Sequence, residues 1–190
     1  MSTLAAQPDA PEFHPLTPDR WDDCEQLFSP RGACTGCWCM WWRLARSEFD
    51  RQAPDQRRMG LKTLVEEGRS TGILAYRAGN PVAWCSIAPR DSFVAVERFR
   101  VLRRIDDRPA RSIVCFFVHK DHRRQGLAAQ LVQAAAIYAA SQGATIVEAY
   151  NLSLSRSRPP GPALPGTWAQ SQRMNRPASS RLPAHRRPAW

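Results

Sequence analysis

The sequence has no long apolar run. Its hydrophobic share of 43% is ordinary for a globular chain. No stretch approaches the roughly 18 to 20 uninterrupted apolar residues that a membrane-spanning helix needs. The first residues carry Asp9, Glu12 and several prolines, and they lack the apolar block followed by small residues that marks a secretory signal. We therefore expect a cytoplasmic protein that, at 190 residues, forms a single compact domain.

Acidic residues are missing from the last part of the chain. Residues 151–190 hold seven Arg, seven Pro and six Ser without Asp or Glu, whereas residues 1–150 hold 20 Lys and Arg against all 17 acids. A segment of this composition, without helical or strand periodicity, cannot bury enough apolar area to offset its ordering entropy. We predict a folded domain over residues 1–150 and a disordered basic tail over 151–190. The arginines are not accompanied by a folded nucleic-acid-binding module or by repeated units of basic and aromatic residues, so nucleic-acid binding is not favoured.

Three of the six cysteines, at positions 34, 37 and 39, lie close together, and the other three are scattered. In a reducing compartment, cysteines are more often buried residues, metal ligands or reactive thiols than disulfides. Cys34, Cys37 and Cys39 have a spacing that suits zinc, but no fourth ligand accompanies them, so we favour a buried or pocket-lining cluster over a metal site. The Trp and Met side chains of residues 38–42 form either part of an acceptor pocket or, as we favour, part of the core.

Apolar periodicity predicts the elements of the first half. A short strand over residues 13–16 precedes a helix over about residues 18–28, which Thr17 caps. A second helix follows over about residues 55–67. Strands are then expected at residues 72–77 and 82–88, joined by the hairpin-turn residues Ala78, Gly79, Asn80 and Pro81.

The second half holds the strongest strand, over residues 112–119, with apolar side chains on both faces as a central strand needs. The charged residues 91–111 before it form a candidate excursion over the site. After the strand, a helix that Gly143 ends and a strand over residues 145–150 complete a strand, crossover helix, strand unit with parallel strands. Four residues fall on one face of this helix, namely Leu127, Leu131, Ala135 and Tyr138.

The turn between this strand and helix has the features of an anion site. In HKDHRRQGLAAQLV, residues 119–132, Gly126 opens the helix, whose unpaired N–H groups and positive dipole end favour a phosphate. Arg123 and Arg124 add positive charge at its mouth. A charged loop before an ordinary helix is the alternative interpretation.

Arg123, Gly126 and Ala128 fit the acetyl-CoA signature of the GNAT superfamily: Arg or Gln, two residues, Gly, one residue, then Gly or Ala. With its CWCMWWR segment and CFFV strand, the chain resembles a bacterial GNAT subgroup over about residues 16–150. The resemblance implies a GNAT α/β fold with a mixed central sheet flanked by helices, and an acyltransferase that moves an acetyl group from acetyl-CoA to a primary amine of a small-molecule or protein acceptor. It also implies that the strand end holds the pantetheine arm and the turn holds the pyrophosphate, through Phe117, Val118, Arg123, Arg124, Gln125, Gly126, Leu127 and Ala128.

The groups that would move protons are not evident in the sequence. Glu97, His119 and His122 are conceivable bases for the amine, and a water relay is the alternative. Tyr138 and Tyr150 are conceivable proton donors, although packing is the default for both. The sequence leaves the catalytic residues, the acceptor and the oligomeric state open.

Family members continue with a further helix and two strands, and that helix commonly supplies a Tyr that protonates the leaving thiolate. Residues 151–190 contain no Tyr and no such pattern. We expect the C-terminal helix and strands to be missing and hypothesise a frameshift or a decayed C-terminus, which a comparison of the gene's reading frames tests. The alternative function is an inactive remnant that binds CoA, or an interaction protein that acts through its basic tail.

Overall fold

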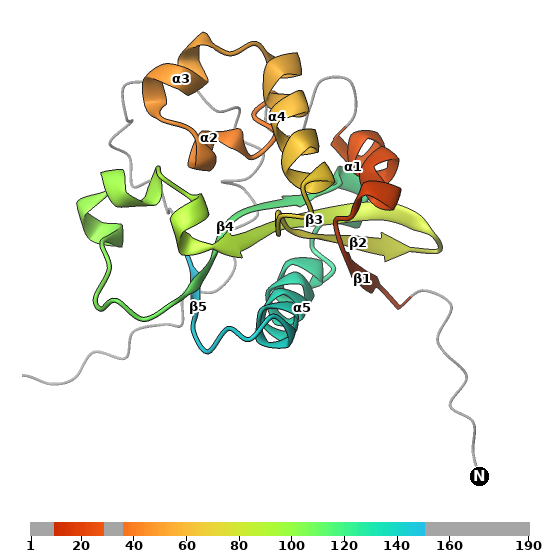
Figure 1. Ribbon diagram of the computed structural model, residues 1–190. Coiled ribbons are helices and arrows are strands. Elements are labelled where there is room, and N and C mark those ends of the chain that lie inside the picture. The colour runs from red at the N-terminus through yellow and green to blue at the C-terminus, as the bar shows by residue number, and fades with distance from the viewer. Residues whose placement is uncertain (1–9, 29–35, 151–190) are drawn as a thin grey trace, which may run out of the picture.

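A five-stranded mixed sheet forms the centre of the structure (Figure 1). The computed structural model describes residues 10–28 and 36–150. The strand order is β1-β2-β3-β4-β5, in which the first four strands pair antiparallel and β5 pairs parallel to β4. The strands are β1 (Glu12–Pro15), β2 (Ile73–Arg77), β3 (Asn80–Pro89), β4 (Arg111–Val118) and β5 (Val147–Ala149). This architecture confirms the predicted α/β fold with a mixed sheet.

Helices lie on both faces of the sheet. Figure 1 shows α1 to α4 above the sheet and α5 below it. The α-helices are α1 (Trp21–Phe28), α2 (Met40–Arg43), α3 (Arg46–Arg51), α4 (Pro54–Glu66) and α5 (Leu127–Ser141). Short 3-10 helices are η1 (Pro18–Arg20), η2 (Arg90–Ser92), η3 (Val96–Arg98), η4 (Arg100–Leu102) and η5 (Lys120–His122). The crossover β4-α5-β5 with parallel strands is the unit that the sequence predicts.

Most elements of the first half agree with the sequence pattern. The predicted helix over residues 18–28 is η1 followed by α1, and the predicted second helix is α4. The short helix α3 was not predicted because RSEFDR has a single buried apolar side chain, Phe49, and no helical stripe. The predicted cap is wrong in detail: the Thr17 side chain makes no capping hydrogen bond, because its Oγ1 accepts one from Arg20 Nη1 at 2.9 Å.

The hairpin between β2 and β3 is tighter than predicted. Only Ala78 and Gly79 form the loop, with φ of 46° and 75°, and β3 begins at Asn80. Positive φ at both central residues is the requirement of a type I′ turn, which matches the twist of the flanking strands. This turn brings the end of the hairpin close to the turn before α5, where Arg77 donates a hydrogen bond to Gln125 Oε1.

The core has two main layers, one on each face of the sheet. Toward α1 to α4, Trp84 is fully buried, its ring meets Phe28 edge to face at 5.9 Å, and its indole N–H donates to Cys39 Sγ at 3.2 Å. Toward α5, four helix residues at helical spacing are buried against β2, β3 and β4, namely Leu127, Leu131, Ala135 and Ala139. Tyr138, predicted on this face, is half-buried at its margin, where its hydroxyl lies 3.2 Å from Ser70 Oγ.

A third cluster anchors the connection between β3 and β4, here called the excursion (residues 90–110). Phe93 and Val96 are buried against Trp42 and Val114. The excursion therefore packs beside the start of β4 by means of its apolar residues, while most of its charged side chains are exposed and Arg90 is buried.

Candidate active site

The turn before α5 presents an uninterrupted series of backbone donors. Among the residues that the structure describes, none accepts a hydrogen bond from the N–H groups of residues 124–128. Arg124 and Gly126 have positive φ, 62° and 75°, a backbone conformation found in anion-binding nests. The first acceptor used within the helix is the Gly126 carbonyl, which binds the N–H groups of Ala129 and Gln130. These donors and the positive end of the α5 dipole fit a pyrophosphate.

Side chains hold this turn in shape. Arg123 Nε donates to the carbonyl of Val118 at 3.0 Å, which ties the turn back to the end of β4. Gln125 Nε2 donates to the carbonyl of Asp121 at 3.2 Å while its Oε1 accepts from Arg77. Arg124 is exposed, as are Gly126 and Ala128, whereas Leu127 anchors the helix start in the core. The turn is thus fixed from behind and open toward solvent.

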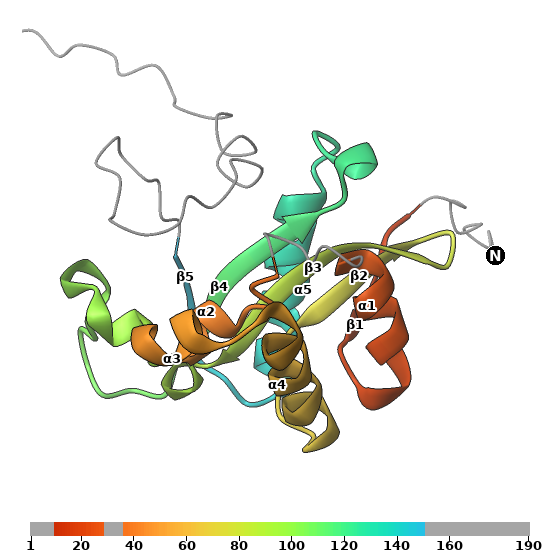
Figure 2. The same cartoon turned by 90° about the horizontal axis from the view of Figure 1, so that it is seen from above.

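The edge of β4 beside this turn has a long unpaired stretch. On one side β3 pairs with β4 as far as Val118. On the other side β5 pairs only with residues 111–113, and the Tyr150 N–H donates to the Ile113 carbonyl at 3.2 Å as the last contact. Figure 2 shows β4 and β5 running apart beyond this point. Within the described residues, β4 from Val114 to Val118 therefore has no strand on its β5 side.

Phe117 and Val118 lie in this unpaired stretch, and their side chains point to opposite faces. Phe117 packs in the layer toward α1, with its ring 5.9 Å from that of Phe28. Val118 packs in the layer toward α5. Both side chains are half-buried against the core, and the open edge of β4 at these residues consists of backbone groups.

The candidate bases and proton donors do not gather at one point. His119 and His122 line an open depression of about 230 Å³ together with the end of α1 and the β2-β3 hairpin, at the opposite end of β4 from its pairing with β5. Glu97 pairs with Arg90 and Arg104. Tyr138 lies on the α5 side of the sheet, and Tyr150 is engaged by charged partners.

A buried arginine that the sequence analysis did not single out ties the excursion to β5. The Arg90 side chain is 3% exposed and donates to Glu148 Oε2 at 2.6 Å, to Glu97 Oε1 at 2.9 Å and to the Leu102 carbonyl at 2.5 Å. It also donates to the hydroxyl of Tyr150. Burial disfavours the charge of Arg90, but its bonds to Glu148 and Glu97 outweigh this effect and raise its pKa.

The same network sets the ionisation of two neighbours. Burial alone would raise the pKa of Glu148, but hydrogen bonds from Tyr150, Arg90 and Ser112 outweigh it and lower this pKa below the ordinary value. Burial and the bond to Glu148 raise the pKa of Tyr150 to about 12. Glu148 is thus a stable carboxylate, and Tyr150 keeps its proton at neutral pH.

Replacing Glu148 by Gln is expected to lower the free energy of unfolding by roughly 2 kcal/mol near neutral pH, because Arg90 loses a charged acceptor. The folded pKa of Glu148 lies below its ordinary 4.5, so its contribution is present above that pH and is lost as the pH falls through the folded pKa. Urea unfolding at about pH 7 and about pH 3.5 should show a difference between wild type and variant that shrinks at the lower pH. Glu66→Gln, at an exposed residue, is the control, and an equal loss at both pH values would contradict the linkage.

The Cys and Trp segment is mainly structural. Trp38, Met40 and Trp42 are buried, which confirms core packing for them, while Trp41 is half-buried. A hydrogen bond with Cys115, together with burial, raises the pKa of the Cys39 thiol well above its ordinary value. Cys34 lies outside the described residues, and among residues 10–28 and 36–150 no group of three or more His, Cys, Asp and Glu side chains has an arrangement that could hold a metal.

The predicted tail, residues 151–190, and the expected loss of C-terminal elements also lie outside the described residues. None of the helices formed by residues 10–28 and 36–150 is long and apolar enough to cross a bilayer.

An open-edged strand that runs into a turn of free N–H groups at a helix start is an arrangement suited to an acyl-CoA ligand. The model of the acetyltransferase (GNAT) family matches residues 36–154, and the chain belongs to this family of acyltransferases. A comparison with curated proteins gives no significant match.

Solved structures share the fold at low sequence identity. An aminoglycoside 6'-N-acetyltransferase from Acinetobacter haemolyticus is 14% identical with a TM-score of 0.51, and the match covers 94% of this chain and 99% of that one. One from Acinetobacter baumannii is 16% identical with a TM-score of 0.51, covering 95% and 99%. A third aminoglycoside N-acetyltransferase, solved in complex with CoA, is 13% identical with a TM-score of 0.53, covering 98% and 100%.

Proposed function

We propose that this protein transfers the acetyl group of acetyl-CoA to a primary amine, using a catalytic domain within residues 1–150 in the cytoplasm. The observation that carries the proposal is the series of unbonded N–H groups over residues 124–128, directly beside the unpaired stretch of β4. The donors suit the pyrophosphate, and the strand edge suits the amide groups of the pantetheine arm, which can bond to it as an added strand would.

The space at Gly126 supports this placement. A Cβ at Gly126 would meet only Gln130 Nε2, at 4.0 Å, so the helix start is open to a ligand of some size. Arg123 braces the turn through the Val118 carbonyl, and the exposed Arg124 supplies a guanidinium for the phosphates. In this pose the acyl end of the ligand lies toward Val114, where β5 leaves β4.

The proposed reaction needs few side-chain groups. The amine nitrogen attacks the thioester carbonyl carbon, the C–N bond forms, the C–S bond breaks and CoA leaves as a thiolate; backbone N–H groups at the β4 edge can hold the carbonyl oxygen. The carboxylates of Glu97 and Glu148 are held by Arg90, so we propose that water carries the amine proton away. Aminoglycosides, the acceptors in the names of two fold neighbours, are included in the acceptor screen.

Two measurements on the purified full chain test the proposal. Calorimetry should detect acetyl-CoA binding at one site, and a thiol assay should detect CoA release with at least one member of a primary-amine panel. Binding without release for any amine would favour the inactive remnant that binds CoA. A folded chain that does not bind acetyl-CoA would overturn the proposal.

A further inference from the structure

Aromatic side chains gather where β4 and β5 separate. The rings of Trp41 and Phe99 lie 6.0 Å apart, those of Trp42 and Phe99 lie 6.2 Å apart, and Trp41 meets Trp42 edge to face at 4.6 Å. Trp41 and Phe99 are half-buried, whereas Trp42 is buried beneath them. We call Trp41, Trp42 and Phe99 the aromatic surface.

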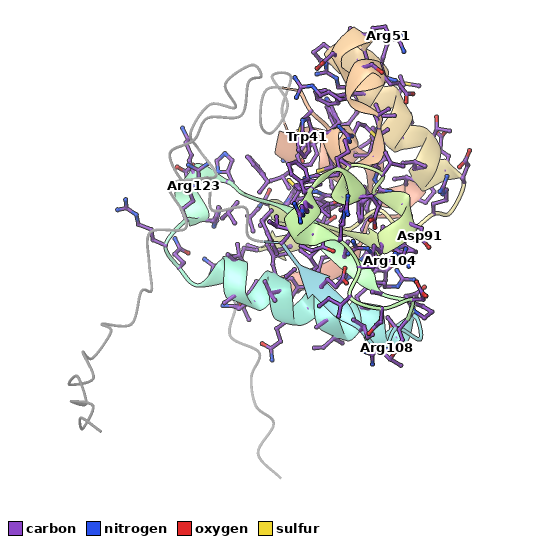
Figure 3. The ribbon with its side chains drawn as sticks, turned by 90° about the vertical axis from the view of Figure 1, so that its left-hand side faces the viewer. Trp41, Arg51, Asp91, Arg104, Arg108 and Arg123 are labelled. Carbon is purple, nitrogen blue, oxygen red and sulfur yellow. The ribbon has the colours of Figure 1, made fainter. Side chains whose placement is uncertain are left out.

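The aromatic surface borders the first unpaired residues of β4. Its members pack in one cluster with Val114, Cys115 and Tyr150. Val114 and Cys115 are the residues that follow the last pairing with β5, and the Tyr150 N–H makes that last contact. This is the point at which the proposed function places the acyl group, so the aromatic surface lies where an attacking amine must arrive. Figure 3 looks onto this side and shows Trp41, in this view, between the turn with Arg123 and the excursion with Asp91 and Arg104.

The charges around the aromatic surface are unfavourable for a polycation. The Arg98 guanidinium lies 5.9 Å from the centre of the Trp41 ring and donates to the Leu44 carbonyl. Asp50, a carboxylate whose charge acts on Arg98, pairs with Arg46 at 2.7 Å. The nearby carboxylates, Glu97 and Glu148, share the buried guanidinium of Arg90, and Glu97 also lies 3.7 Å from Arg104. A ligand with several ammonium groups needs carboxylates that are not already paired with arginines. Around Trp41, the carboxylates named above are each paired with an arginine, and Arg98 adds a positive charge beside the ring.

We infer that Trp41 and Phe99 recognise the acceptor, and that the acceptor is a primary amine attached to an aromatic body rather than a polycation such as an aminoglycoside. The inference rests on the proposed function and specifies its acceptor. An aromatic acceptor stacks on the half-exposed rings and presents its amine to the acyl group at Val114. Such an amine carries a single positive charge, so Arg98 repels it less than it would repel a polycation.

Steady-state kinetics on the full chain, with acetyl-CoA saturating, test the inference. Tryptamine and phenethylamine represent aromatic amines, and kanamycin and spermidine represent polycations. We expect kcat/KM to be higher for the aromatic amines by about tenfold or more. Trp41→Leu and Phe99→Leu should each raise the KM for tryptamine severalfold while the Kd of acetyl-CoA, measured by calorimetry, stays unchanged. Phe13→Leu is the control, since Phe13 is also half-buried but packs in the layer toward α5.

Three results would count against the inference. Higher kcat/KM for kanamycin or spermidine would overturn it, and so would a tryptamine KM that is the same in Trp41→Leu and wild type. Acetyl-CoA binding without turnover of either aromatic amine would overturn the inference alone. A folded wild-type chain that does not bind acetyl-CoA is a separate outcome, which overturns the proposed function and the inference with it.

Discussion

Replacing Gly126 by Glu is expected to weaken acetyl-CoA binding at least 100-fold, or roughly 3 kcal/mol in binding free energy. The residue opens α5 at the centre of the unbonded N–H groups, and its Cβ would project into open space. A carboxylate on this Cβ would compete with the pyrophosphate for the same donors and repel its charge. Calorimetric titration of the purified variant with acetyl-CoA gives the measurement, with circular dichroism to verify the fold.

Gly126→Gln separates charge from backbone strain. The φ of Gly126 is 75°, a left-handed conformation that disfavours Gln and Glu alike. Gln has the length and shape of Glu without its charge, so it should lose much less affinity than Glu. Equal losses in the two variants would show that the conformation of residue 126, and not the charge placed there, governs binding.

Replacing Gly72 by Ala is expected to lower the free energy of unfolding by about 3 kcal/mol, at the upper end of the usual cost of overpacking. A Cβ on Gly72 would lie 2.3 Å from the Cys85 carbonyl oxygen and 2.4 Å from Trp84 Cη2. Neither neighbour can yield easily, because the carbonyl belongs to β3 and the Trp84 ring is fully buried. Urea unfolding followed by tryptophan fluorescence measures the change.

Gly60→Ala is the matched control for this prediction. Gly60 lies inside α4, and an added Cβ would meet only the flexible end of Met40, at 3.1 Å from its Cε. Ala is a better helix former than Gly by roughly 0.5 to 1 kcal/mol, so this variant should be neutral or slightly more stable. A Gly72→Ala variant as stable as Gly60→Ala would mean that β2 and β3 can shift apart at no cost.

The elements with clear periodicity could be predicted from the sequence, because a strand or helix with one buried face has apolar residues at regular spacing in its own segment. The strand now seen as β4 and the buried face of α5 at Leu127, Leu131 and Ala135 are of this kind. The turn with Gly126 could be predicted as well, since its signature occupies adjacent residues. That it holds acetyl-CoA stays a prediction.

The network around Arg90 could not be predicted, because its partners are far apart in the sequence. Glu148 lies 58 positions from Arg90, and nothing near either residue indicates the other. The approach of Phe99 to Trp41 depends on how the excursion folds, and its three short 3-10 helices leave no periodic pattern. The Thr17 cap was wrong because a nearby Arg20 competes for the hydroxyl, a choice that local sequence rules do not contain.

The short pairing of β5 has a consequence for amide hydrogen exchange. Only three residues of β5 pair with β4, and the guanidinium of Arg90 supplies the main side-chain link to Glu148. Such a strand can open without unfolding β2 and β3, whose amides are buried between neighbours on both sides. Deuterium should therefore enter residues 147–149 sooner than the central strands. A ligand lodged between β4 and β5 would slow that entry, which makes this strand a natural reporter of occupancy even in the absence of turnover.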